Sequence, residues 1–100
     1  MGSIKAKLRV KHSNICNAKV MIKHQMIGFS QANKQGVKAN FITSLVAKIG
    51  NKTVYELKTN EYLSKNPLFK FKFYAVSGEI VEITWVDLLG NSDTKFIAIR

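Results

Sequence analysis

Apolar and polar residues alternate one by one along much of this chain. The pattern is clearest near the carboxyl end, where Val81, Ile83 and Trp85 are separated by single residues that are charged or hydroxylated. Successive side chains of a β-strand point to opposite faces, so this alternation predicts a strand with the only tryptophan on its inner face. Turn residues at 90–93 precede a second alternating segment. We therefore expect a terminal hairpin that supplies the largest side chain of the core.

The same period recurs upstream and predicts an all-β fold. Phe69, Phe71 and Phe73 alternate with lysines, which places the three rings in the core and the ammonium groups in water. Lysines in the first segment favour a sheet edge, where charge discourages unwanted pairing. About seven short strands at this spacing are typical of an immunoglobulin-like antiparallel β-sandwich. The expected strands cover residues 4–10, 16–22, 41–49, 53–58, 69–73, 78–87 and 94–100.

Residues 25–40 lack a period, and we predict a long loop there with bends at Gly28 and Gly36. A loop of this length in a small domain is either mobile or used for binding. A single helical turn is expected at Tyr62 and Leu63. No other helix is predicted.

The chain length of 100 residues is that of a single domain, residues 1–100. Residues 1–3 are left outside the predicted fold, because Gly2 and Ser3 resemble a cloning remnant. The amino terminus lacks the apolar run of a secretory signal, and no apolar run reaches the length of a membrane span, so no membrane insertion is expected. The single cysteine, Cys16, excludes an internal disulfide.

The net charge of +10 is the main compositional signal, with 16 Lys and Arg residues against six Asp and Glu residues. Such a field attracts polyanions or acidic partners, although a solvated lysine-rich surface would give the same count. A basic β-sandwich module that binds nucleic acid or another polyanion is therefore an alternative function. The alternation argues against a nucleic-acid stacking platform, because it puts the phenylalanine rings and the lysines on opposite faces.

Reactive chemistry finds little support in the sequence. Cys16, His24 and Met26 offer the soft ligands that copper prefers, but in an extended chain Cys16 and His24 would lie roughly 26 Å apart. A cysteine-dependent enzyme would need an exposed thiol beside a base, whereas Cys16 falls on the apolar face of its strand. We predict no catalytic, metal-binding or cofactor-binding residue, and no enzymatic activity.

The segment after the second expected strand is the best candidate for a partner interface. Met26 and Ile27 are adaptable apolar residues at the start of the long loop, although a simple turn with a hydrogen-bonded histidine would show the same pattern. The candidate interface residues are His24, Met26, Ile27, Gly28, Phe29 and Phe41.

Motifs spaced along nearly the whole chain resemble the SoxZ family of bacterial sulfur-oxidation proteins. Residues 24–28, His-Gln-Met-Ile-Gly, resemble the family's His-Pro-Met-x-x-Gly, with Gln25 in place of the usual proline. Residues 64–71 resemble its Ser-x-Asn-Pro-x-Phe stretch. The order and spacing of the motifs carry the resemblance more than any single one. Further similar segments are Gly36 with residues 40–42, the turn at 49–54, and residues 84–87 with Gly78 and Gly90.

The resemblance implies a non-catalytic subunit of a sulfur-carrier heterodimer. In that family an immunoglobulin-like sandwich pairs one to one with SoxY, which carries sulfur intermediates on a cysteine at the end of a glycine-rich arm. Residues 96–100 do not resemble that arm, so Cys16 is not expected to be the carrier thiol. The resemblance also implies a periplasmic location, reached by co-export with the partner, and transient contacts with other sulfur-oxidation enzymes. It implies neither a nucleic-acid partner nor a cofactor.

Overall fold

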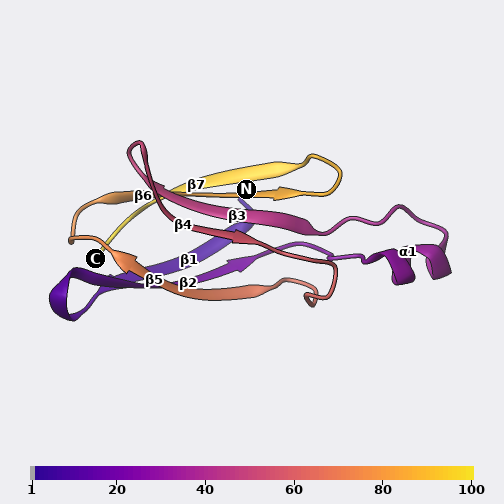
Figure 1. Cartoon of the computed structure of the whole chain (residues 1–100), viewed down its shortest axis with the longest axis horizontal. Coiled ribbons are helices and arrows are strands. Elements are labelled where there is room, and N and C mark those ends of the chain that lie inside the picture. The colour runs from indigo at the N-terminus through magenta and orange to yellow at the C-terminus, as the bar shows by residue number, and fades with distance from the viewer. Residues whose placement is uncertain (1) are drawn as a thin grey trace.

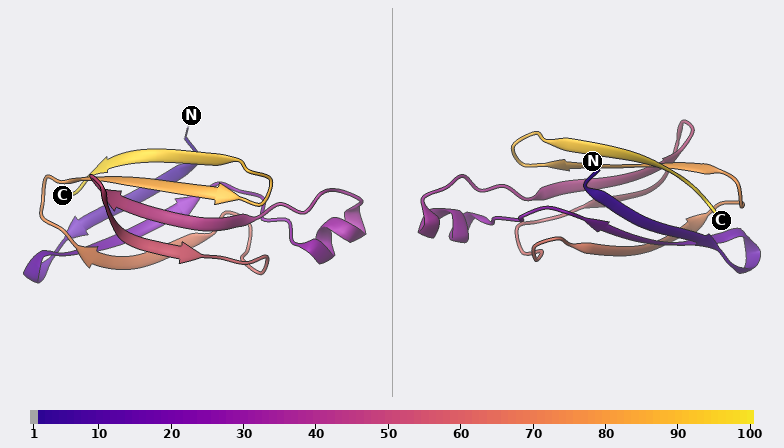
Figure 2. Two further views of the ribbon diagram at one scale, coloured as in Figure 1. Left: turned by 45° about the horizontal axis from the view of Figure 1, so that its top comes forward. Right: turned by 180° about the vertical axis from the view of Figure 1, so that it is seen from behind.

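Two antiparallel sheets packed face to face make up the fold (Figures 1 and 2). The structure is a computed structural model and describes residues 2–100. The first sheet has the order β1-β2-β5 and the second the order β4-β3-β6-β7. The predicted all-β sandwich of seven strands is therefore confirmed. The strands are β1 (Ile4–Val10), β2 (Ile15–Ile22), β3 (Ile42–Ile49), β4 (Lys52–Lys58), β5 (Leu68–Tyr74), β6 (Ile80–Asp87) and β7 (Ser92–Ala98).

Strand β4 pairs with β3, so the strands divide into three and four. A constant-type immunoglobulin domain instead places its fourth strand in the first sheet. The rings of Tyr55 and Phe71 stack with centroids 4.1 Å apart, which joins the edge of β4 to β5. On the other side β1 is an edge strand, as its lysines predicted, and the backbone N–H of Val10 donates to the carbonyl of Arg100 at 3.0 Å.

The core lies between the inner faces of the two sheets. Phe69, Phe71 and Phe73 lie opposite the apolar positions of β2, and Trp85 lies opposite Leu45 of β3. Burial of one such side chain contributes roughly 1.5–3 kcal/mol, so these residues supply much of the stability. The structure buries all six core candidates, namely Phe69, Phe71, Phe73, Val81, Ile83 and Trp85.

Residues 29–35 form a short helix, α1 (Phe29–Gln35), so the prediction of a loop there was wrong. The helical period is absent from the sequence because only Ala32 of the helix is buried. A distant residue caps the start of the helix, and a local glycine ends it. The carboxylate of Glu61 accepts a hydrogen bond of 2.7 Å from the backbone N–H of Phe29. Gly36 adopts a left-handed φ of 68° and donates its N–H to the carbonyl of Ala32.

Helix α1 projects beyond the end of both sheets, which makes the molecule elongated (Figures 1 and 2). The principal extents are 49, 22 and 21 Å. The helical turn expected at Tyr62 and Leu63 is instead a non-helical turn, in which the side chain of Asn60 accepts from the N–H of Tyr62 at 3.0 Å. Strands β1 and β2 are linked by a short 3₁₀ helix, His12–Asn14.

Ser3 joins the fold, although the sequence prediction left residues 1–3 aside. Its backbone N–H and hydroxyl both donate to Oδ2 of Asp93, at 2.9 and 2.7 Å. Its hydroxyl oxygen accepts from the indole N–H of Trp85 at 2.8 Å. These hydrogen bonds from Ser3 lower the pKa of Asp93. Ser3 therefore satisfies the one polar atom of the buried tryptophan. Met1 lies outside the described residues.

The Ser3→Ala variant tests this contact. The substitution leaves the indole N–H of Trp85 without its acceptor, and we expect the free energy of unfolding to fall by about 1–2 kcal/mol. Urea unfolding followed by the fluorescence of the single tryptophan measures this change. Ser77→Ala, at an exposed serine, is the matched control and should leave the midpoint unchanged. Equal midpoints for the two variants would contradict the role of Ser3.

Candidate functional site

The six interface candidates differ in how far they are exposed to solvent. Met26 and Phe41 are buried, and the side chain of His24 is 8% exposed. Ile27 and Gly28 are half-buried. Phe29 is 57% exposed, and its ring meets that of Phe41 edge-on with centroids 5.6 Å apart. The candidates therefore lie together at the α1 end of the sandwich, but only some of them reach the surface.

Both nitrogens of the His24 imidazole take part in hydrogen bonds. Its Nδ1 accepts from the backbone N–H of Met26 at 3.0 Å, so the ring proton sits on Nε2. Nε2 then donates to Oδ2 of Asp87 at 3.0 Å. The ring also packs edge-on against Trp85, with centroids 5.3 Å apart. Because both ring nitrogens are engaged, His24 has no nitrogen left to act as a metal ligand or as a base.

The carboxylate of Asp87 is the centre of a buried polar cluster. The residue is 4% exposed, and the side-chain amide of Asn40 donates to its Oδ2 at 3.0 Å. Asn91 donates through its backbone to Oδ1 and through its side chain to Oδ2, at 2.8 and 3.1 Å. Burial acts to raise the pKa of Asp87, but the hydrogen bonds from His24, Asn40 and Asn91 outweigh it and lower the pKa. The charged form is therefore the one that this site stabilises.

Residues 26–41, which we call the arm, are fixed to the sandwich at their base. The backbones of Ile27 and Asn40 exchange two hydrogen bonds, of 2.6 and 2.8 Å. Met26 has a left-handed φ of 55°, a strained conformation for a residue with a long side chain. Its sulfur accepts from the backbone N–H of Ile42 at 3.3 Å, where β3 begins. The base of the arm is therefore rigid, whereas its far end carries α1.

Gly28 is required at this base by a close approach of the chain. A Cβ atom added to Gly28 would lie 3.2 Å from the carbonyl oxygen of Glu61 and 3.3 Å from its Cβ. Those distances are tighter than ordinary packing, so a larger residue would push the turn at residues 59–66 away. Glu61 would then lose its hydrogen bond to the start of α1.

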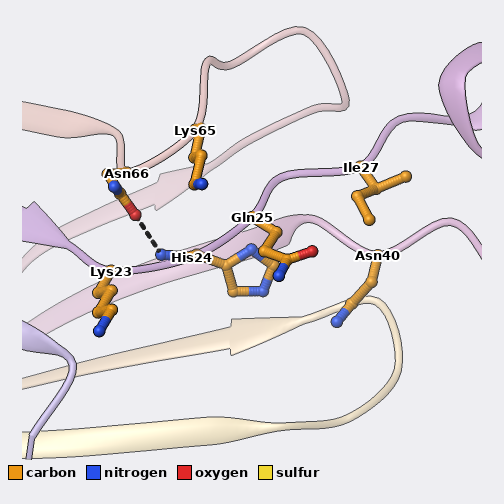
Figure 3. A pocket seen from close by; sticks show the side chains of 7 residues that line it. All are labelled: Lys23, His24, Gln25, Ile27, Asn40, Lys65 and Asn66. Atoms are coloured by element: carbon orange, nitrogen blue, oxygen red, sulfur yellow. Dashed lines mark hydrogen bonds between the residues drawn. The ribbon is translucent and has the colours of Figure 1, made fainter.

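An open hollow of about 500 Å³ lies beside His24 (Figure 3). Lys23 and Lys65 contribute ammonium groups to its lining, and Asn66 links the segment at His24 to the turn before β5. The amide oxygen of Asn66 accepts from the backbone N–H of His24 at 3.0 Å. Such a lining suits a carboxylate or another small anion. The residues that line the hollow are Lys23, His24, Gln25, Ile27, Asn40, Lys65 and Asn66.

The thiol of Cys16 lies in the core. The residue is fully buried on β2, opposite Phe73, and burial raises the pKa of the thiol. A buried protonated thiol is a poor nucleophile. Over residues 2–100, no three His, Cys, Asp or Glu side chains gather in a way that could hold a metal ion. Within the same residues no helix has the length and apolar character needed to cross a membrane.

Sequence reasoning missed Asp87 as a site residue, although a signal was present. Asp87 has the same parity as Val81, Ile83 and Trp85, so the alternation already directs a carboxylate toward the core. A charge in that position must find hydrogen-bond donors. The donors come from residues 24, 40 and 91, and no local pattern reveals that they converge.

These observations define an immunoglobulin-like sandwich domain whose buried polar groups bind one another and brace the base of a projecting arm. The chain belongs to the SoxZ family, because the sequence model of that family, described as sulphur oxidation protein SoxZ, matches residues 4–97. Membership gives the chain a role in sulfur oxidation. Among curated proteins, none matches the sequence at a significant level.

The Asp87→Asn variant tests the buried cluster. It removes a charge that four hydrogen-bond donors stabilise, and we expect the free energy of unfolding to fall by about 3 kcal/mol at neutral pH. Because the folded-state pKa is lowered, the stabilisation by Asp87 is fully present above the unfolded value near 3.9 and is lost as the pH falls through the folded value. Unfolding free energies of the two proteins, measured from neutral pH down to about pH 3, should therefore stay apart as far as about pH 4 and begin to converge only below it. Parallel curves would contradict the assignment.

Thiol labelling tests the burial of Cys16. A water-soluble thiol reagent should not react with the folded protein, and its reaction should follow the unfolded fraction as urea is added. Rapid modification in the absence of urea would show an accessible thiol and would reopen the question of a cysteine nucleophile.

Proposed function

We propose that this chain is the non-catalytic subunit of a SoxY–SoxZ-type sulfur-carrier heterodimer in thiosulfate oxidation. Family membership supports a role in sulfur oxidation. A sulfur carrier needs an accessible thiol, and the single cysteine of this chain is buried in the core. The thiol would therefore belong to a one-to-one partner that resembles SoxY, and this chain would hold that partner.

The arm is the surface that we propose for this partner, and its projecting helix is the observation that carries the proposal. Helix α1 has seven residues and buries only Ala32. An isolated helix of that length is marginal in water. Phe29 and Val37 are exposed at its two ends, by 57% and 49%. A partner that covers these side chains would stabilise the helix and bury apolar surface in the same step.

The six interface candidates take two roles in this proposal. Phe29 and Ile27, with Gly28 between them, would contact the partner, and Val37 joins them. His24, Met26 and Phe41 would act from beneath, because they hold the base of the arm or pack against the ring of Phe29. Rigid support lowers the entropy lost when a partner binds, so these buried residues would contribute without direct contact.

Location and further partners complete the proposal. The heterodimer would work in the periplasm, reached by co-export of this chain with its partner. Other sulfur-oxidation enzymes would meet the dimer transiently and act on the partner's thiol. No cofactor, nucleic acid or membrane insertion has a role in this function.

Co-expression with a SoxY-like chain tests the proposal. We expect a one-to-one complex that survives gel filtration. The Phe29→Ala variant should weaken the complex by about tenfold or more, because an aromatic side chain at the centre of an interface is worth at least about 2 kcal/mol. Titration calorimetry with the two purified chains measures the change.

Ile80→Ala is the matched control, because Ile80 is 56% exposed at the opposite end of the sandwich. It should bind like the wild type. A complex that fails to form at all would refute the function. A complex weakened by Ile80→Ala, but not by Phe29→Ala, would keep the heterodimer and refute the arm as its interface.

A further inference from the structure

The outer face of the sheet β1-β2-β5 gathers positive charge from three segments of the chain. Lys7 of β1 lies opposite Lys19 of β2, which in turn lies opposite Lys70 of β5. In the next row of the same face, Arg9 and Lys72 flank an asparagine of β2. All the cationic side chains of this face are exposed. We call them the cationic face: Lys5, Lys7, Arg9, Lys19, Lys70 and Lys72.

No carboxylate offsets this charge, since none of the six Asp and Glu residues lies on β1, β2 or β5. The outer face of the other sheet differs, because Glu56 and Glu82 lie there among the lysines. Glu56 even pairs with Lys58 at 3.5 Å. Among the described residues no helix or loop crosses the cationic face (Figures 1 and 2). Its charge is therefore open to a partner.

The row formed by Lys7, Lys19 and Lys70 destabilises the free protein. Side chains directly opposite each other on neighbouring strands have Cβ atoms about 4.5–5.5 Å apart, and like charges at that spacing repel. The repulsion has no compensation within the described residues, and it would be relieved by carboxylates placed over the row. The charge of this face therefore lowers the stability of the free protein and favours the binding of an anionic surface.

Apolar side chains beside the lysines favour a protein as that partner. Lys5 shares its row with Met21 and Leu68, which are 38% and 50% exposed. A single-stranded nucleic acid would need several aromatic rings among the cations for stacking, and the strands of the cationic face expose one ring, Tyr74, at the end of the face. Lysine also predominates over arginine, the better fork for phosphate. Mixed apolar and cationic groups suit an acidic protein surface.

A groove of about 760 Å³ runs along the β1 border of the face, where β1 approaches β7. Lys7 and Arg9 line it from the face, and Lys95 and Arg100 line it from the other side. Its walls also include the exposed ring of Phe96. The groove adds a concave element with the same combination of positive charge and apolar surface.

We infer that the cationic face and its bordering groove form a docking surface for an acidic protein, distinct from the arm. Attraction between exposed charges gives fast association, modest affinity and strong sensitivity to salt. Those properties suit enzymes that must meet a carrier and then leave it. The identification of the partner as an enzyme that acts on the carrier rests on the proposed function. The attraction of this face for an acidic protein does not.

A binding titration tests the inference. The full chain is added to a fluorescently labelled, glutamate-rich peptide that contains leucines, and the anisotropy of the label is measured across a salt series. The variant Lys7→Gln/Lys19→Gln/Lys70→Gln should weaken binding by about tenfold at low salt. The variant Lys48→Gln/Lys52→Gln/Lys58→Gln removes the same charge elsewhere and should weaken it by less than about twofold. The first variant should also melt at a higher temperature than the wild type in low salt, because like-charge repulsion is removed.

Three results would overturn the inference. Equal weakening by both variants would mean that only net charge attracts the peptide. In the second, oligothymidylate would bind the wild type more tightly than the peptide does and would lose affinity only in the first variant. That result would show that the face binds nucleic acid. A lower melting temperature for the first variant would refute the repulsion. Pairing with a SoxY-like chain is a separate readout, because an apolar interface should persist at salt concentrations that release the peptide.

Discussion

The carboxylate of Asp87 accepts hydrogen bonds from three parts of the chain that are far apart in sequence. His24 follows β2, Asn40 precedes β3 and Asn91 lies in the turn after β6. A buried charge is unfavourable unless donors surround it, so the meeting of these segments stabilises the fold. Their meeting point is also the base of the arm. The interaction that satisfies one buried charge thus fixes the position of the helix that we propose as the partner interface.

The two proposed surfaces differ in the physics of binding. The arm presents apolar side chains on a short helix that buries little of itself, which suits a partner that stays bound. The cationic face presents ammonium groups with no carboxylate among them, which suits partners that come and go. The carrier subunit that we propose would need both kinds of contact. The buried thiol of Cys16 is consistent with a subunit that holds and presents, and that leaves the sulfur chemistry to other chains.

The parts of the structure that escaped prediction share one cause. The first N–H of helix α1, that of Phe29, is capped by the carboxylate of Glu61, which lies 32 residues further along the chain. The sequence pattern predicts no role for Ser3, yet its hydroxyl accepts a hydrogen bond from the indole of Trp85, 82 residues away. His24 was a candidate for a surface contact, but its ring points inward to Asp87. Each contact joins residues that a local pattern cannot relate, and the donor and acceptor types alone do not select the pair.

The order of apolar and polar residues by itself determined which side chains face the core, because side-chain direction in a strand is set by local backbone geometry. That is why Trp85, the three phenylalanines of β5 and the edge position of β1 could be read directly. Only the tertiary structure decided which strands share a sheet. Strand pairing brought lysines that are scattered along the chain onto one face, and it brought three donor residues to one carboxylate. Pairing depends on contacts between distant segments, and the period of a single strand carries no information about its neighbours.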